Sequence, residues 1–135
     1  MSELFSESWI KSLGDAWNND PKIVDPLNKA GFSSKISYGF IGEKNPRCLL
    51  DIVNGKIIRA SMYNNETIDW DLRADPHNWE KWITKGFGLT KLGPAVATRA
   101  LQFVQGDYRQ MIRNPLLSRP FLRHFVLMTQ LDTAF

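Results

Sequence analysis

The sequence predicts an α+β domain in which helices pack on one face of a five-stranded antiparallel sheet. Three observations support this fold class. Apolar residues recur with helical periodicity at the start of the chain, alternate with polar residues through its middle, and return to helical periodicity in its last third. The 135 residues contain no internal repeat and no linker-like stretch, so we expect a single domain over residues 1–135.

Two helices are predicted in residues 4–30. From Phe5 to Trp17 the apolar residues follow one another at helical spacing, which is typical of a helix with one buried face. The Asn-Asn-Asp-Pro segment at 18–21 ends this helix, and a second short helix near residues 22–29 ends at Gly31.

Four strands in an antiparallel meander are predicted in residues 35–73. Apolar and polar residues alternate from residue 35 to residue 40, as in a strand with one buried face. Asn54-Gly55 is a strong hairpin signal, because both central residues of this turn adopt positive φ angles. A second tight turn, at residues 64–65, is expected to lead into the fourth strand.

The fourth strand, over residues 67–73, alternates most clearly. Asp69 and Asp71 share one face, and apolar residues occupy the other. We interpret the two aspartates as solvated residues on a wet face of the sheet, and not as a pair of catalytic carboxylates.

Helices and one further strand are predicted in the last third. Asp75-Pro76 suits the start of a helix, and Gly86 suits its end. The remaining elements are a short helix at 89–97, a fifth strand at 99–104, a helix at 108–113 and a final apolar helix after Pro120.

The sequence gives no support for covalent chemistry. His77 and His124 lie far apart, neither has a partner at metal-ligand spacing, and Cys48 lies in a predicted strand, where a buried and inert thiol is expected. We therefore expect no enzyme activity, no metal and no cofactor. A lone cysteine also forms no internal disulfide, so the cytoplasm is the simplest location.

Charge is distributed unevenly along the chain. Residues 1–85 hold 11 basic and 12 acidic side chains, whereas residues 86–135 hold six basic and two acidic ones. Five of those six are arginines, which suit phosphate and carboxylate groups. The basic region predicts either a solvated helix face or transient contact with an anionic membrane surface or partner. Nucleic acid is not an expected partner, because the aromatic residues lie on apolar stripes.

Large apolar side chains are unusually frequent in the helices of the last third. Burial of each contributes about 1.5–3 kcal/mol, so we do not expect them to be left exposed. Three interpretations are open: an ordinary solid core, a protein–protein surface, or the wall of a ligand cavity.

Four short motifs occur in a particular order along the chain. They are Asn54-Gly55 in the hairpin, the helix at 79–86 that ends in glycine, the Gly-Pro-Ala-Val segment at 93–96, and the strand at 101–107 that ends in Gly-Asp. In their order and spacing the chain resembles the sterol carrier protein type 2 family. The resemblance implies a domain that encloses an apolar cavity between sheet and helices. It also implies non-catalytic binding or carriage of a fatty acid, acyl-CoA, sterol or phospholipid.

The resemblance further implies which residues line the ligand site. The expected cavity wall is drawn from Trp79, Trp82, Phe87, Leu92, Val96, Phe103, Met111, Leu116, Phe121, Phe125 and Met128. Arg109 and Arg113 are four residues apart, so they are expected to share a helix face and hold a carboxylate or phosphate head group at the cavity mouth. The alternative for this pair is a role as ordinary solvated arginines.

Two other functions stay open at this point. The chain could be an accessory module whose apolar C-terminal helix binds a partner enzyme or a second copy, so both a monomer and a homodimer are considered. It could also be an enzyme acting in the same cavity, for which His124, Tyr108 and Asp107 are the candidate titratable groups.

Overall fold

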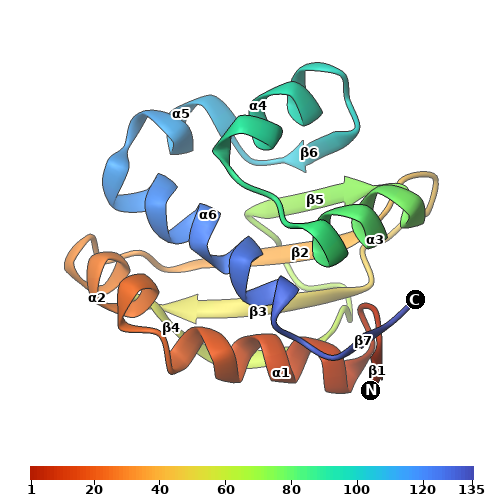
Figure 1. Cartoon of the computed structure of the whole chain (residues 1–135). Coiled ribbons are helices and arrows are strands. Elements are labelled where there is room, and N and C mark those ends of the chain that lie inside the picture. Colours follow the sequence, from red (N-terminus) through yellow and green to blue (C-terminus); the bar gives the residue numbers. More distant parts are fainter.

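A five-stranded sheet with helices on one face forms the body of the molecule in the computed structural model (Figure 1), which confirms the predicted α+β fold class. The structure describes residues 1–88 and 91–135, and only the backbone of residues 89 and 90. The elements are β1 (Ser2–Glu3), α1 (Glu7–Asn18), α2 (Pro21–Lys29), β2 (Ser34–Phe40), β3 (Cys48–Val53), β4 (Lys56–Met62), β5 (Trp70–Ala74), α3 (Pro76–Lys85), α4 (Leu89–Ala97), β6 (Leu101–Gln105), α5 (Tyr108–Arg113), α6 (Pro115–Thr129) and β7 (Thr133–Ala134).

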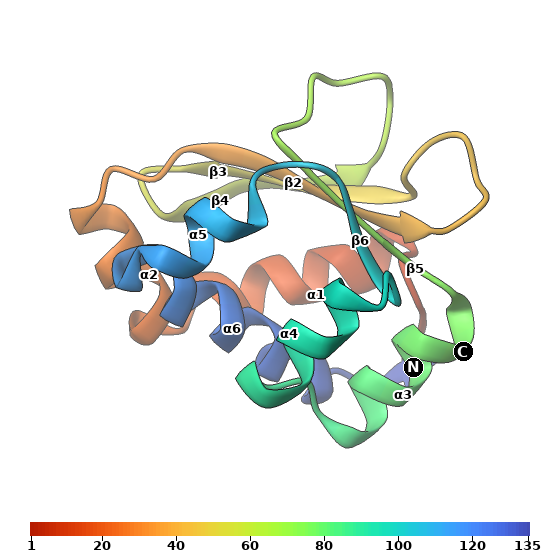
Figure 2. The same cartoon turned by 90° about the horizontal axis from the view of Figure 1, so that it is seen from above.

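Strand β2 lies at the centre of the sheet, whose strand order is β4-β3-β2-β5-β6. The sheet is mostly antiparallel, but β2 and β5 are parallel neighbours. The predicted four-strand meander is therefore wrong at its last step. Residues 63–69 do not form a tight turn but cross the sheet on the face opposite the helices (Figure 2). Alternation defines the two faces of a strand but not its neighbour, and β2, buried along most of its length, takes β5 as its second partner.

The predicted hairpin between β3 and β4 is confirmed. Asn54 and Gly55 adopt φ angles of 49° and 85°. A Cβ atom on Gly55 would lie 2.5 Å from the backbone nitrogen of Asn28, so α2 packs directly against the turn. Trp17 of α1 donates a hydrogen bond from Nε1 to the carbonyl oxygen of Gly55 at 2.9 Å. One turn thus holds both N-terminal helices against the end of the sheet.

The outer face of the sheet, which is the face opposite the helices, is not solvent-exposed throughout, contrary to the sequence prediction. Asp71 of β5 is only 6% exposed, and its ion-pair partner Arg73 is 5% exposed. The guanidinium group contacts both carboxylate oxygens, at 2.6 and 3.0 Å. It also donates to the carbonyl oxygens of Phe40 and Glu43, so loop 41–47 lies over the pair. Asp71 was expected to be solvated, but this loop removes it from water.

Asp69 has a different structural role. Its side chain is exposed, as expected, and its Oδ2 accepts a hydrogen bond from the backbone N–H of Lys35 at 2.8 Å and another from Ser34. These bonds fasten the end of the crossover segment to the start of β2. The two aspartates therefore act separately and do not form a carboxylate pair.

The inner face of the sheet is covered by the helices (Figure 2). Ser6 and Asp20 cap α1 and α2, each accepting a hydrogen bond from a backbone N–H of the first turn. Asp20 also accepts an ion-pair hydrogen bond from Arg123 of α6, with Nε and Oδ2 2.7 Å apart. These contacts join α6 to α2 and place it across the middle of the helical layer.

Helix α6 begins earlier than predicted, at Pro115 and not after Pro120. Pro115 suits the first helical position, and the side chain of Asn114 caps the helix by accepting from the N–H of Leu116. Pro120 lies inside the helix, where it removes one backbone hydrogen bond, yet it is buried. A short parallel ribbon of β1 and β7, absent from the sequence prediction, joins the ends of the described chain.

Candidate ligand-binding site

A row of aromatic rings fills the space between α3, α6 and the sheet. Trp82 stacks on Phe87 with ring centroids 4.4 Å apart, and Phe87 meets Phe125 edge-on at 4.9 Å. Phe125 in turn meets Phe121 at 5.1 Å. Trp79 contacts Trp82 at 5.6 Å and donates from Nε1 to the carbonyl oxygen of Gly39. These five residues of the expected cavity wall lie together, and in this state they pack ring against ring.

The other expected wall residues are distributed over three places. Leu92 and Met128 are buried in the same core as the aromatic row. Val96 and Phe103 are half-buried and border an open groove beside the edge strand β6. Leu116 is 44% exposed at the start of α6. The structure therefore does not bring all eleven residues around one space.

An apolar crevice lies at the end of the helical layer where α2, α5 and the start of α6 meet. Its free volume is about 10 Å³, which is room for about one water molecule. Its lining residues are Trp17, Leu27, Phe32, Ile36, Met111, Leu117 and Phe121. A ligand of any size must displace some of these side chains.

Only Met111 and Phe121 of this lining were among the expected site residues. The other five come from α1, α2, the loop before β2, β2 itself and α6, and four of them precede residue 40. All eleven expected wall residues, in contrast, lie between residues 79 and 128. Trp17 was the available signal that the N-terminal helices contribute to the site. It lies on the apolar stripe of the first predicted helix, and a side chain of this size is expected to pack against a neighbouring element.

Helix α5 is the shortest of the helices that line the crevice. It has six residues, and its main packing partner is α6. Asp107 caps it, accepting a hydrogen bond from the N–H of Gln110. Its one buried residue is Met111, whose unbranched side chain adopts many shapes at low cost. A short helix held by few contacts opens more readily than the core strands.

Arg109 and Arg113 flank Met111 on α5, two residues to either side. Two residues along a helix turn the chain by about 200°, so both arginines face away from Met111. Both side chains are exposed, and neither belongs to the lining of the crevice. Of the second arginine pair in the C-terminal region, Arg123 is bound to Asp20.

One polar pair is buried beside the crevice. His124 has no exposed surface, and its ring contacts Trp17 and Phe121, which both line the crevice. Its Nδ1 contacts the carbonyl oxygen of Phe121, which can only accept, so the ring proton lies on Nδ1. Nε2 therefore accepts a hydrogen bond from the hydroxyl group of Tyr38, at 2.9 Å. Burial lowers the pKa of His124 to about 4, although the Phe121 carbonyl opposes this, so the imidazole is neutral at pH 7.

The candidate groups for an enzymatic function do not converge. His124 is bonded to Tyr38, whereas Tyr108 packs its ring on Phe103 and Asp107 caps α5. Burial raises the pKa of the Cys48 thiol well above its usual value, as expected for an inert strand cysteine. In the described part of the chain, no three His, Cys, Asp or Glu residues gather closely enough to hold a metal ion.

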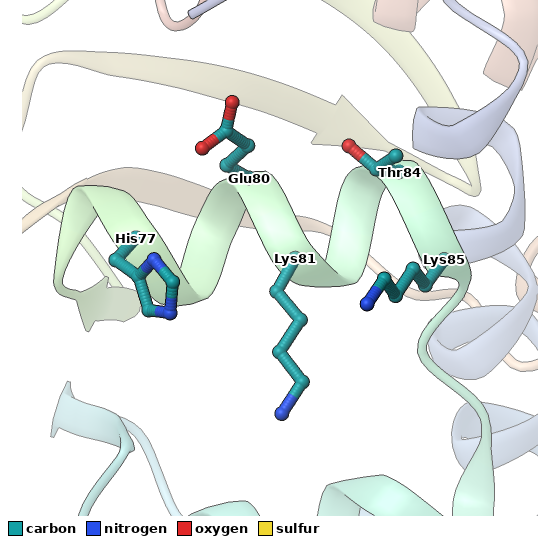
Figure 3. A pocket seen from close by; sticks show the side chains of 5 residues that line it. All are labelled: His77, Glu80, Lys81, Thr84 and Lys85. Carbon is teal, nitrogen blue, oxygen red and sulfur yellow. The ribbon is translucent and has the colours of Figure 1, made fainter.

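A second hollow lies on the surface of α3 (Figure 3). His77, Glu80, Lys81, Thr84 and Lys85 line it, and all five side chains come from one exposed helix face. A polar surface supplied by a single helix encloses nothing, so this hollow is a weaker candidate than the crevice. Outside residues 89 and 90, none of the helices is both long and apolar enough to cross a bilayer.

Comparison with known proteins matches the chain at the level of fold. No protein-family model matches the sequence, and a search of curated proteins gives no match. The crystal structure of sterol carrier protein 2 aligns with a TM-score of 0.76 at 13% identity, covering 96% of this chain and 100% of the other. A conserved hypothetical protein and candidate sterol carrier from Thermus thermophilus aligns with a TM-score of 0.72 at 13% identity, covering 99% and 93%.

A third solved structure extends the comparison. It is described as UbiJ-SCP2, a ubiquinone synthesis protein, and aligns with a TM-score of 0.60 at 11% identity, covering 93% of this chain and 91% of that one. The similarity thus spans the whole sheet and the helical layer, although few side chains are shared. The chain has the fold of sterol carrier protein 2.

Proposed function

We propose that this protein binds a hydrophobic ligand between α2, α5 and α6 and carries it without covalent chemistry. The observation that carries the proposal is the crevice: seven apolar side chains converge under a short, weakly held helix, inside a sterol carrier fold. A fatty acid, acyl-CoA, sterol or phospholipid supplies the hydrocarbon that such a lining would bury. Placement in the cytoplasm belongs to the same proposal and rests on the lone, buried Cys48.

Ligand uptake on this proposal requires the crevice to expand. A dry cavity of about 150 Å³ accepts a ligand as small as benzene, so the present free space must grow considerably. Outward movement of α5 together with a new rotamer of Met111 would provide it. Displacement of Met111 also opens a path toward Phe121 and the aromatic row, which includes five of the eleven wall residues expected from the sequence.

The polar end of the ligand is assigned to the rim of the crevice. Arg109 and Arg113 lie on the exposed side of α5, and Met111 lies on its buried side, so on this proposal a carboxylate or phosphate binds over the helix while its hydrocarbon chain enters beneath it. Charge-assisted hydrogen bonds to guanidinium groups are among the stronger polar contacts. Arg109→Ala with Arg113→Ala should weaken fatty-acid binding and leave binding of an uncharged sterol unchanged.

The alternative of an interaction module has less support. Its docking surface was expected to be the apolar face of the C-terminal helix, but Phe121, Phe125 and Met128 on that face are buried within the protein itself. An enzymatic role has no reactive group placed at the crevice, since Tyr38 and His124 have no exposed surface.

Native mass spectrometry of the purified protein, with organic extraction and analysis of the extract, tests the proposal directly. Fluorescence titration with a labelled fatty acid gives a second measurement. We expect a co-purifying lipid or saturable uptake of one ligand per chain. A dimer that yields no lipid and takes up neither fatty acid, sterol nor phospholipid would contradict the carrier function and favour the interaction module.

A further inference from the structure

The segment that forms α5, α6 and the corner between them is basic and contains no acidic residue. From residue 108 to residue 129 there are four arginines and no aspartate or glutamate. Arg123 is occupied by Asp20, whereas Arg109, Arg113 and Arg119 are exposed. Asp107, which caps α5, is the acidic residue adjoining this stretch. The corner therefore presents a net positive surface.

An apolar side chain projects from the middle of this basic surface. Leu116 follows the capping residue Asn114 and Pro115 at the start of α6, and 44% of it is exposed. Arg113 precedes it by three residues, and Arg119 follows it by three, one helical turn further along the same face. An exposed leucine is thus flanked in the sequence by two exposed arginines.

This leucine is adjacent in the chain to the lining of the crevice. The next residue, Leu117, is part of the crevice lining, and so is Met111 on the other side of the corner. Figures 1 and 2 both place α2 and α5 at the same end of the molecule, on either side of the first turns of α6. A surface that covered Leu116 would therefore also cover the rim through which the crevice opens.

From these observations we infer that the α5–α6 corner docks on an anionic lipid surface. Leu116 enters the outer part of the acyl region, and Arg109, Arg113 and Arg119 bind lipid phosphates around it. The inference rests on the proposed function, because it gives the crevice its route to a ligand. When the corner is bound to the membrane, α5 can open toward the acyl chains and not toward water. Opening then avoids the free-energy cost of exposing Met111 and Leu117 to water.

An acidic protein is a less suitable occupant than a membrane. Arginines alone would fit either partner, but an apolar residue at the centre of the patch and a hydrocarbon-lined opening directly behind it fit lipid better. Each arginine adds only modestly to the affinity for an anionic bilayer, so three arginines and one leucine support reversible binding and not permanent anchoring. Reversibility is what a carrier that moves between membranes needs.

Flotation with vesicles tests the inference. Vesicles of phosphatidylcholine with phosphatidylglycerol are compared with vesicles of phosphatidylcholine alone, at low and at raised salt. Two variants change the corner: Leu116→Ser, and Arg113→Gln combined with Arg119→Gln. Met62→Ser is the control for the leucine, since Met62 is 40% exposed at the distant end of β4. Lys44→Gln with Lys85→Gln, which removes two exposed charges elsewhere, is the control for the arginines.

We expect the wild-type chain to float with anionic vesicles only, and less at raised salt. The double arginine variant should lower the partition coefficient roughly tenfold or more, and Leu116→Ser about three- to tenfold. The two controls should lower it less than twofold. Binding that does not depend on anionic lipid, or that both corner variants retain, overturns the inference. An equal loss in the controls overturns it too, because the effect would then be one of total charge or of folding.

A separate assay distinguishes this inference from the function on which it rests. Uptake of a fluorescent fatty acid is measured in solution with no vesicles present. Uptake by the wild type and by Leu116→Ser, together with loss of vesicle binding in Leu116→Ser, supports both. Uptake without any vesicle binding by the wild type overturns the docking inference and leaves the carrier function standing. Absence of uptake when the assay is repeated with a labelled fatty acid, a sterol and a phospholipid overturns the carrier function, and the docking inference with it.

Discussion

The hydroxyl group of Tyr38 donates a hydrogen bond to Nε2 of His124 at 2.9 Å, at a point where neither side chain has any exposed surface. The bond joins the central strand β2 to α6, the helix that crosses the helical layer. Aromatic rings surround it, including those of Trp17 and Trp79. Each partner satisfies a polar atom that would otherwise be buried without a hydrogen bond, so the pair fixes how α6 sits on the sheet.

Removing the Tyr38 hydroxyl should destabilise the protein. Tyr38→Phe keeps the ring but leaves Nε2 of His124 buried without a donor, at a cost of about 1–3 kcal/mol. Urea unfolding at pH 7 followed by tryptophan fluorescence measures the change. Tyr63→Phe, at a half-buried position in the crossover segment, is the control and should cost less. Equal stability of the two variants would contradict the role assigned to the pair.

Acid should destabilise the protein through His124. The pKa of this residue falls from 6.5 to about 4 on folding, chiefly because burial disfavours the charged form. Between these two values the unfolded chain binds a proton that the folded chain does not. The stability contributed by the neutral ring is therefore complete above pH 6.5 and is lost as the pH falls toward 4, by at most about 3 kcal/mol.

The free energy of unfolding at several pH values between 7 and 4, measured for wild type and His124→Phe, checks this expectation. The variant should be less stable at pH 7, because Tyr38 loses its acceptor, and should lose less stability on acidification. His77→Gln, which changes an exposed histidine, should keep the wild-type pH dependence. A parallel pH profile in His124→Phe and wild type would show that another group is responsible.

The buried ion pair on the outer face of the sheet should also be important for stability. Arg73→Met leaves the Asp71 carboxylate buried without its partner and removes the hydrogen bonds to the carbonyl oxygens of Phe40 in β2 and Glu43 in loop 41–47. Loss of one member of such a pair costs about 3–5 kcal/mol. Arg59→Met breaks the more exposed pair with Glu66 and should cost less than about 1 kcal/mol. Thermal unfolding of the two variants under one set of conditions compares their stabilities. Similar losses of stability would contradict the importance assigned to the buried pair of Asp71 and Arg73.

Local sequence patterns were sufficient for the elements but not for all of their pairings. Asn54-Gly55 predicted the hairpin because the required φ angles are a property of the two residues themselves. The place of β5 beside β2 depends on a crossover that no local pattern encodes. The burial of Asp71 likewise depends on loop 41–47, some thirty residues earlier in the chain, which lies over a face that alternation alone marks as polar.

The candidate site was predictable only in part for a related reason. The aromatic residues of α3 and α6 were expected at the site because the resemblance assigns the frequent apolar residues of this region to a cavity wall, and they do lie together. The crevice, however, takes most of its lining from the N-terminal forty residues, which meet Met111 and Leu117 only after folding. Which of two apolar clusters packs solid and which leaves space is decided by the shapes of facing side chains.

Substitutions at Met111 and Val96 distinguish a ligand held in the crevice from a ligand held by the cavity wall expected from the sequence. Met111→Trp fills the crevice, so uptake of a labelled fatty acid should fall roughly tenfold or more, while overpacking costs about 1–3 kcal/mol of stability. Val96→Trp blocks uptake if the expectation from the sequence is right, since that expectation puts Val96 in the cavity wall. Val96 borders the open groove beside β6 instead, so a ligand held in the crevice should bind this variant normally. Circular dichroism confirms that both variants fold. Loss of uptake in Val96→Trp with normal uptake in Met111→Trp would contradict binding in the crevice and would place the ligand in the groove beside β6.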